Sequence, residues 1–135
     1  MIDLKAGFHN IIFEKDSSYD STFVTHRGKF RWLRMPMGLT QAPAHFQYVV
    51  EDVLSGSPTD RKLPVVVYLD DIAVFGDDEE QVLEDTVEAI QRLTGAGFMI
   101  NLKKSQLVER GAKVLGHQWS SGGFWAPCTT KVEAL

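Results

Sequence analysis

Two adjacent aspartates, Asp70 and Asp71, have the residue type and surroundings of metal ligands. They stand between two apolar runs, residues 65–69 and 72–75. Adjacent carboxylates repel each other, whereas a cation that bridges them removes the repulsion, and hard cations prefer carboxylate oxygens. The pair therefore indicates a divalent metal site. The motif Tyr68-x-Asp70-Asp71 is weak evidence by itself, because a polar turn without any chemical function can have the same residues.

The segments around the aspartates predict how they are held. Residues 65–69 and 72–75 are β-branched and aromatic, which is typical of two strands joined by a tight hairpin with the acids at its tip. Residues 2–4 look like the end of another strand. Residues 22–25 and 30–33 flank a turn at 26–29 and predict a second hairpin.

Two helices and a last group of strands complete the predicted elements. Pro43 suits the first turn of a helix that ends at residues 55–58, and Asp77 or Asp78 can cap a second helix. The expected buried stripe of this second helix is Val82, Leu83, Thr86, Val87, Ile90 and Leu93. Residues 98–102 read as a strand, and residues 114–119 and 124–125 as a final hairpin. The order predicts an α+β fold in which helices pack on one face of an antiparallel sheet.

Composition and charge limit the possible functions. The chain has 135 residues, of which 44% are hydrophobic, so it can form one core, and no apolar run approaches the roughly 20 residues of a membrane helix. We expect a soluble, intracellular protein with no membrane partner. The net charge of −4 predicts weak binding to nucleic acid by this chain alone. Much of the acidity lies in residues 77–88, which we interpret as a solvated helix face.

Five sequence blocks, in order, resemble the reverse transcriptases of gypsy-type long-terminal-repeat retrotransposons. The blocks are residues 2–11, 35–47, 65–72, 97–104 and 114–117. The resemblance implies a polymerase palm at residues 1–135, with the fingers truncated at the N-terminus and the thumb and RNase H domain absent. It also implies an RNA-directed DNA polymerase that adds deoxynucleotides to a primer 3′ end by two-metal-ion nucleotidyl transfer.

The resemblance assigns a role to individual residues. The metal ligands are Asp3, Asp70 and Asp71, which are expected to come together on neighbouring strands and to bind two Mg²⁺ ions, or Mn²⁺ in their place. In the absence of metal, at least one of these acids should have a raised pKa. Lys103 or Lys104 can protonate the leaving pyrophosphate, although both also fit as ordinary surface lysines. The expected nucleotide-binding residues are Leu4, Phe8, Met37 and Gly38, and those for primer and template are Pro43, Tyr68, Leu115 and Gly116.

Several alternatives stay open at this level. Phe8 resembles the aromatic floor that excludes a ribose 2′-hydroxyl, yet an aromatic residue there also fits an ordinary core. Met37 departs from the phenylalanine that the family often has, which leaves the shape of the nucleotide pocket open. The four histidines have no ligand spacing and are expected to serve packing or the surface.

The alternative function is a catalytically silent remnant or domesticated retrotransposon domain that acts only as a binding module. An RNA-dependent RNA polymerase shares the metal chemistry, but Phe8 and the block at 35–44 argue against it. The expected partners are an RNA or DNA template with its primer, deoxynucleoside triphosphates, and the fingers, thumb and RNase H segments of a parent polyprotein. By the same resemblance the location is cytoplasmic or a virus-like particle, and the isolated fragment is expected to be inactive.

Overall fold

The computed structural model describes residues 1–14, 21–56, 60–107, 109–111, 113–114, 117–119 and 125–127. In chain order the elements are β1 (Ile2–Asp3), η1 (Gly7–Asn10), β2 (Thr22–Thr25), β3 (Gly28–Arg31), α1 (Ala42–Ser55), β4 (Val65–Tyr68), β5 (Asp71–Val74), α2 (Glu79–Gly95), β6 (Lys113–Val114), β7 (His117–Trp119) and β8 (Trp125–Pro127). η1 is a 3-10 turn, and the others are strands and α-helices.

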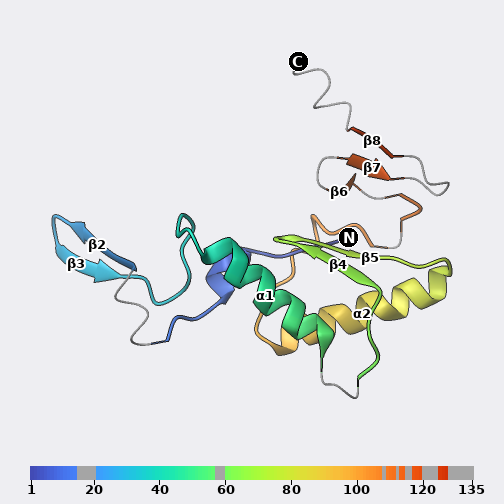
Figure 1. Cartoon of the computed structure of the whole chain (residues 1–135), viewed down its shortest axis with the longest axis horizontal. Coiled ribbons are helices and arrows are strands. Elements are labelled where there is room, and N and C mark those ends of the chain that lie inside the picture. The colour runs from blue at the N-terminus through green and yellow to red at the C-terminus, as the bar shows by residue number, and fades with distance from the viewer. Residues whose placement is uncertain are drawn as a thin grey trace.

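The strands form three small antiparallel sheets. The central sheet has the order β1-β5-β4, the β2–β3 hairpin is separate, and the third sheet has the order β6-β7-β8. Helices α1 and α2 lie together beneath the central sheet, and the β2–β3 hairpin projects at one end of the molecule (Figure 1). The predicted α+β class, with antiparallel strands and packed helices, is therefore confirmed.

The core lies between the two helices and the central sheet. Helix α1 contributes Phe46, Val50 and Leu54, all almost completely buried, and the sheet contributes Ile2 and Ile72, which have no exposed surface. Residues four apart lie on one face of a helix, and this spacing turns the apolar side of α1 toward the sheet. The strand that carries Asp3 is thereby fixed by the burial of the residue before it.

Helix boundaries follow the sequence signals. Pro43 lies in the first turn of α1, where its missing N–H costs no helical hydrogen bond, and Gly56 ends the helix with a φ of 68°. Asp78 caps α2, because its carboxylate accepts a hydrogen bond of 2.9 Å from the backbone N–H of Gln81. Both predicted helices are confirmed.

The prediction for the buried face of α2 was partly wrong. Leu83 and Val87 are about half exposed, whereas Asp85 is 1% exposed and forms an ion pair with Arg61. Gln81 donates a second hydrogen bond to the same carboxylate, at 3.3 Å. An ion pair with a residue outside the helix thus allows an acid to be buried where the apolar pattern favoured leucine or valine. The acidic segment is accordingly not a uniformly solvated face.

Three strand predictions also need correction. Strand β3 begins at Gly28 instead of residue 30, since the turn needs only His26 and Arg27, and Gly28 adopts a φ of 124°. Residues 98–102 form a single bridge between Ile100 and Leu4 in place of a strand. The segment 114–119 is divided between β6 and β7, which pair with each other, so the last unit has three strands where a hairpin of two was expected.

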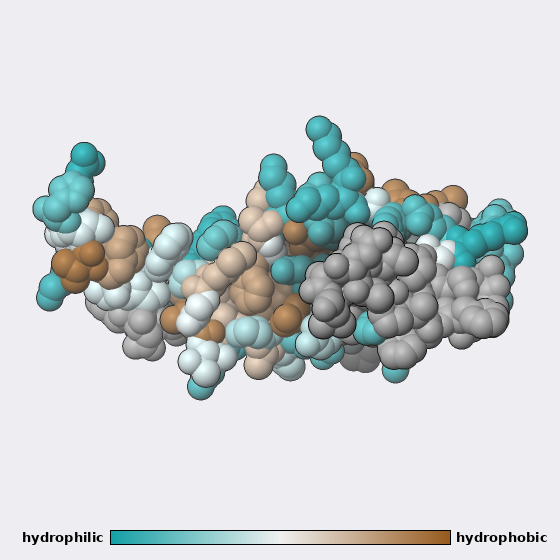
Figure 2. All heavy atoms as spheres, turned by 90° about the horizontal axis from the view of Figure 1, so that it is seen from above, coloured by the Kyte–Doolittle hydropathy of each residue, from teal (hydrophilic) through white to brown (hydrophobic). Residues whose placement is uncertain are grey.

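Hydrophobic side chains reach the surface at the end of the molecule that the β2–β3 hairpin forms (Figure 2). The exposed residues there are Phe23, Val24, Phe30, Trp32 and Leu33. Within the residues the structure describes, the helices are too short or too polar to cross a membrane.

Candidate active site

The three aspartates of the sequence analysis meet at one end of the central sheet. Strand β1 pairs with β5 so that Asp3 lies opposite Asp71, and β5 pairs with β4 so that Asp71 also lies opposite Tyr68. The hairpin turn consists of Leu69 and Asp70, and Leu69 has a φ of 52°. The tip therefore carries one aspartate instead of two, and Asp71 is the first residue of β5.

The surroundings of Asp70 oppose ionisation of its carboxyl group. Burial raises the pKa of its carboxyl above the usual value, and the negative charges of Asp3 and Asp71 raise this pKa further. Its Oδ1 atom is buried and has no hydrogen-bond partner among the described residues. The expectation that one acid of the cluster has a raised pKa is confirmed at Asp70.

Gly7 lies directly beside the Asp70 carboxylate. A Cβ atom added to Gly7 would stand 2.5 Å from Asp70 Oδ1 and 2.9 Å from the ring of Phe46. The 3-10 turn η1 can therefore approach the hairpin tip only because residue 7 has no side chain. Gly7 lies in the first block singled out from the sequence, but its glycine identity alone did not point to this contact.

A turn at residues 101–105 lies along the opposite side of β1. The N–H of Asp3 donates to Ser105 Oγ at 3.0 Å, and the N–H of Asn101 donates to the carbonyl of Asp3 at 2.8 Å. Lys103 and Lys104 occupy this turn with exposed side chains. The predicted lysines are thus in a turn that is hydrogen-bonded to the strand bearing Asp3, and Ser105 is a neighbour that sequence reasoning missed.

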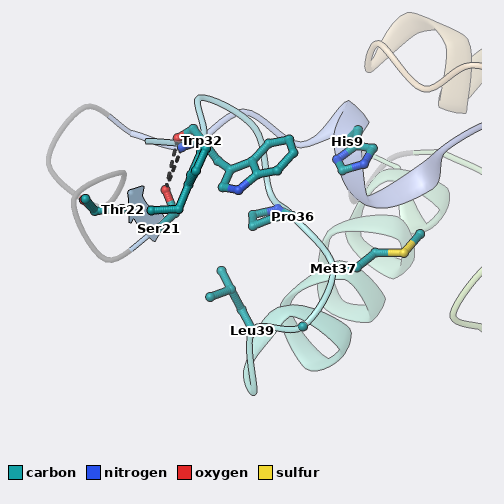
Figure 3. A pocket seen from close by; sticks show the side chains of 9 residues that line it. His9, Ser21, Thr22, Trp32, Pro36, Met37 and Leu39 are labelled. Atoms are coloured by element: carbon teal, nitrogen blue, oxygen red, sulfur yellow. Dashed lines mark hydrogen bonds between the residues drawn. The ribbon is translucent and has the colours of Figure 1, made fainter. Parts of the chain in front are cut away.

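A cavity of about 450 Å³ lies between η1, the β2–β3 hairpin and the loop before α1 (Figure 3). Met37 and Gly38 line it together with His9 and Trp32. The imidazole of His9 stacks on the Trp32 indole with ring centroids 5.8 Å apart, and its Nδ1 contacts the carbonyl of Met35 at 3.1 Å. His9 is a packing residue, as expected.

A family comparison identifies the chain. Residues 1–119 match the family model described as reverse transcriptase (RNA-dependent DNA polymerase). The chain belongs to the reverse transcriptase family.

Relatives and solved structures agree with this assignment. The Tf2-3 and Tf2-7 transposon polyproteins of Schizosaccharomyces pombe are 32% and 31% identical to this reverse transcriptase chain over 99% of its length. The chain spans 10% of the length of these relatives. It resembles the foamy viral protease-reverse transcriptase in complex with an RNA/DNA hybrid, with a TM-score of 0.83 and 28% identity, over 98% of this chain and 17% of that one. The double-stranded DNA complex of the foamy viral protein gives a TM-score of 0.80 at the same identity, over 99% of this chain and 28% of that one.

The reverse transcriptase aspartates fit a divalent metal. Reverse transcriptases generally use divalent ions. Asp3, Asp70 and Asp71 supply the hard oxygen donors that such ions prefer. The Asp70 carboxyl has a raised pKa, and its buried Oδ1 has no hydrogen-bond partner among the described residues. Among the described residues, however, no three acidic, histidine or cysteine side chains are already gathered as a metal-binding group.

The residues predicted to bind nucleotide, primer and template differ in how far they are exposed. Leu4 is 5% exposed and packs in the core, so little of it is accessible to a nucleotide. Phe8 is partly buried and stacks on Phe46, with ring centroids 4.6 Å apart. Met37 and Tyr68 are exposed, and Gly38 has a φ of 95°, a conformation that favours glycine. Leu115 and Gly116, the expected primer-binding pair, lie outside the described residues.

The contact between Gly7 and Asp70 gives a testable expectation. Gly7→Ala should destabilise the chain by about 1–3 kcal/mol, because the new methyl group must displace either the carboxylate or the Phe46 ring. Urea unfolding measures the loss. Gly95→Ala is the matched control, since a Cβ there meets no atom within 4 Å and the last residue of α2 gains helix propensity. Equal stability of the Gly7 and Gly95 variants would contradict the contact.

Proposed function

We propose that this chain is the catalytic palm of an RNA-directed DNA polymerase from a gypsy-type long-terminal-repeat retrotransposon. The observation that carries the proposal is the convergence of Asp3, Asp70 and Asp71 at one end of the central sheet in a chain of the reverse transcriptase family. The relatives it matches are transposon polyproteins. Residues 1–135 would then be a partial palm inside a longer polyprotein that acts in the cytoplasm or in a virus-like particle.

The three carboxylates would hold two Mg²⁺ ions, or Mn²⁺ in their place. When bound, the metals activate the primer 3′-hydroxyl and stabilise the leaving pyrophosphate. Asp3 and Asp70 supply the principal ligands from adjoining segments of the sheet, and Asp71 is a secondary ligand or an electrostatic helper. Lys103 or Lys104, exposed on the turn beside β1, donates a proton to the pyrophosphate oxygen as negative charge develops there.

The substrate sites follow the same proposal. Leu4, Phe8, Met37 and Gly38 would form the deoxynucleotide site, while Pro43, Tyr68, Leu115 and Gly116 would contact primer and template. The foamy viral neighbours are bound to an RNA/DNA hybrid and to double-stranded DNA. Tyr68 and Pro43 are exposed, as contact with nucleic acid requires.

The direct test is RNA-templated DNA synthesis by the polyprotein that contains this chain. With poly(rA), an oligo(dT) primer, dTTP and Mg²⁺, the proposal predicts primer extension that chelator abolishes. Asp3→Asn should abolish it as well. A folded polyprotein that extends no primer on RNA or DNA templates would instead favour the silent binding module.

The 135-residue chain alone should bind primer-template weakly. Its net charge is −4, because 18 Asp and Glu residues outnumber 14 Lys and Arg residues, and the excess of acids repels phosphates. We expect a dissociation constant weaker than about 10 μM at 0.15 M salt, as in sequence-independent binding. Fluorescence anisotropy with a labelled RNA/DNA hybrid measures it, and a nanomolar constant would refute the expectation.

A further inference from the structure

The side chain of Gln47, in α1, makes three hydrogen bonds, which use both of its N–H groups and its oxygen. Its Oε1 accepts from the backbone N–H of Leu69 at 2.7 Å, and its Nε2 donates to the carbonyl of Val67 at 2.7 Å and to Glu51 Oε1 at 2.6 Å. These partners fix the orientation of the amide, because only a nitrogen can donate to a carbonyl and a carboxylate. Two of the three bonds reach the catalytic hairpin.

These two bonds take the place of a neighbouring strand. Strand β4 is an edge of the central sheet, and the carbonyl of Val67 and the N–H of Leu69 flank Tyr68, whose own pairing is with Asp71. A strand added at that edge would bond the same two groups, since backbone groups of alternate residues point to the same side. A planar amide offers a donor and an acceptor on two separate atoms, as the backbone of an added strand would.

The location of the contact links it to Asp70. Leu69 is the first residue of the two-residue turn and has a φ of 52°, a left-handed conformation that residues with a Cβ rarely adopt. Asp70 follows it directly, with Gly7 close on the other side of its carboxylate. The bond from Leu69 N–H to Gln47 therefore holds the Tyr68–Leu69 peptide, which enters the turn one residue before Asp70.

We propose that Gln47 is a positioning residue, which holds the β4–β5 turn in the left-handed conformation that directs Asp70 toward Asp3. The inference rests on the proposed function, because it takes Asp70 as a metal ligand. Gln47 itself touches no reacting atom. A simpler role, a tie between α1 and the sheet, would affect stability without affecting the metal site specifically.

The test is Mn²⁺ binding by the 135-residue chain, measured from the free-Mn²⁺ signal in electron paramagnetic resonance. Gln47→Met keeps the length of the side chain and removes all three bonds. We expect it to weaken Mn²⁺ binding by about tenfold, the lower end for a residue that orients metal ligands from outside the first shell. Gln47→Glu retains an acceptor for Leu69 N–H and should recover part of the affinity. The Leu69 amide should exchange its hydrogen faster in the methionine variant.

Two controls separate positioning from general stability. Arg92→Met removes the hydrogen bonds to the carbonyls of Leu54 and Arg61, at the other end of α1, and should lower the unfolding temperature while Mn²⁺ affinity stays within about twofold of wild type. Glu51→Ala removes only the Gln47 bond that does not reach the hairpin. It too should leave Mn²⁺ affinity unchanged.

The outcomes distinguish this inference from the proposed function. Unchanged Mn²⁺ affinity in Gln47→Met, or equal loss in Gln47→Met and Arg92→Met, would overturn the positioning role and leave the proposed function standing. A wild-type chain whose Mn²⁺ binding is insensitive to Asp70→Asn would overturn both, because no metal site would then exist at the hairpin. If Gln47→Met does not fold, Gln47→Glu provides the test. Mn²⁺ affinity equal to that of wild type would show that the bond to Leu69 N–H is sufficient for positioning. Loss of Mn²⁺ affinity, with stability unchanged and the Leu69 amide still protected from exchange, would overturn the positioning role.

Discussion

Asp70→Asn should abolish nucleotide incorporation by the parent polyprotein and, in the same substitution, stabilise the metal-free chain. Incorporation should fall by more than about a thousandfold, because loss of a metal ligand removes at least as much electrostatic stabilisation as loss of one oxyanion-hole donor. The unfolding temperature of the isolated chain in chelator at pH 8 should rise by about 2–4 °C, a modest gain since water screens a partly buried carboxylate.

The raised pKa of Asp70 determines how the stability difference between the wild-type chain and Asp70→Asn changes with pH. The folded chain holds the Asp70 proton more tightly than the unfolded chain does, since burial and the charges of Asp3 and Asp71 raise this pKa. The ionised carboxylate therefore lowers the stability of the fold, and this cost appears as the pH rises from the ordinary aspartate pKa through the raised one. Below the ordinary pKa the wild-type chain and Asp70→Asn should be equally stable.

Thermal unfolding at pH 3.5 and pH 8 in the presence of chelator measures the difference between the two chains. Asp77→Asn is the control, because Asp77 is exposed and lies outside the aspartate cluster. It should not increase stability at pH 8. An Asp70→Asn variant that is no more stable than wild type at pH 8 would show that the acids do not repel one another in the folded chain.

The part of the site that could be predicted from sequence is the part that local pattern controls. The β-branched and aromatic runs before Asp70 and after Asp71 predict a hairpin, and the observed β4 and β5 differ from the expected ends by one residue. The left-handed turn was not predictable, because Leu69 shows no preference for a positive φ. The N–H of Leu69 is bonded to Gln47, which is 22 residues away in sequence.

Where prediction failed, a contact distant in sequence was responsible. The apolar pattern of α2 placed Leu83 and Val87 in the core, but Arg61 allows Asp85 to be buried and shifts the buried face. In the same way, the closeness of Gly7 to Asp70 depends on the packing of η1 against the hairpin and α1. Sequence reasoning therefore predicted that Asp3, Asp70 and Asp71 lie together, as the structure places them, and missed the residues packed around them.

Phe8→Ala should raise ribonucleotide incorporation relative to deoxyribonucleotide incorporation in the parent polyprotein by about 10- to 1000-fold. Phe8 follows Asp3 by five residues and lies in η1, between Gly7 at the Asp70 carboxylate and His9 at the cavity that Met37 and Gly38 line. Its ring is held rigidly by stacking on Phe46, at 4.6 Å between centroids. A rigid aromatic face rejects a 2′-hydroxyl by overlap and offers it no hydrogen bond.

The same stacking means that Phe8→Ala also removes core packing, so a fall in total activity would not test the sugar gate. The ratio of kcat/KM for dTTP and UTP tests it, because about 1.4 kcal/mol of lost discrimination changes that ratio tenfold. Phe98→Leu is the matched control: Phe98 is 5% exposed and meets the same Phe46 ring edge-on, at 6.2 Å between centroids. It should lower stability and leave the ratio unchanged. If Phe8→Ala leaves the ratio unchanged as well while activity persists, Phe8 is a core residue like Phe98, and the nucleotide's sugar must be selected elsewhere.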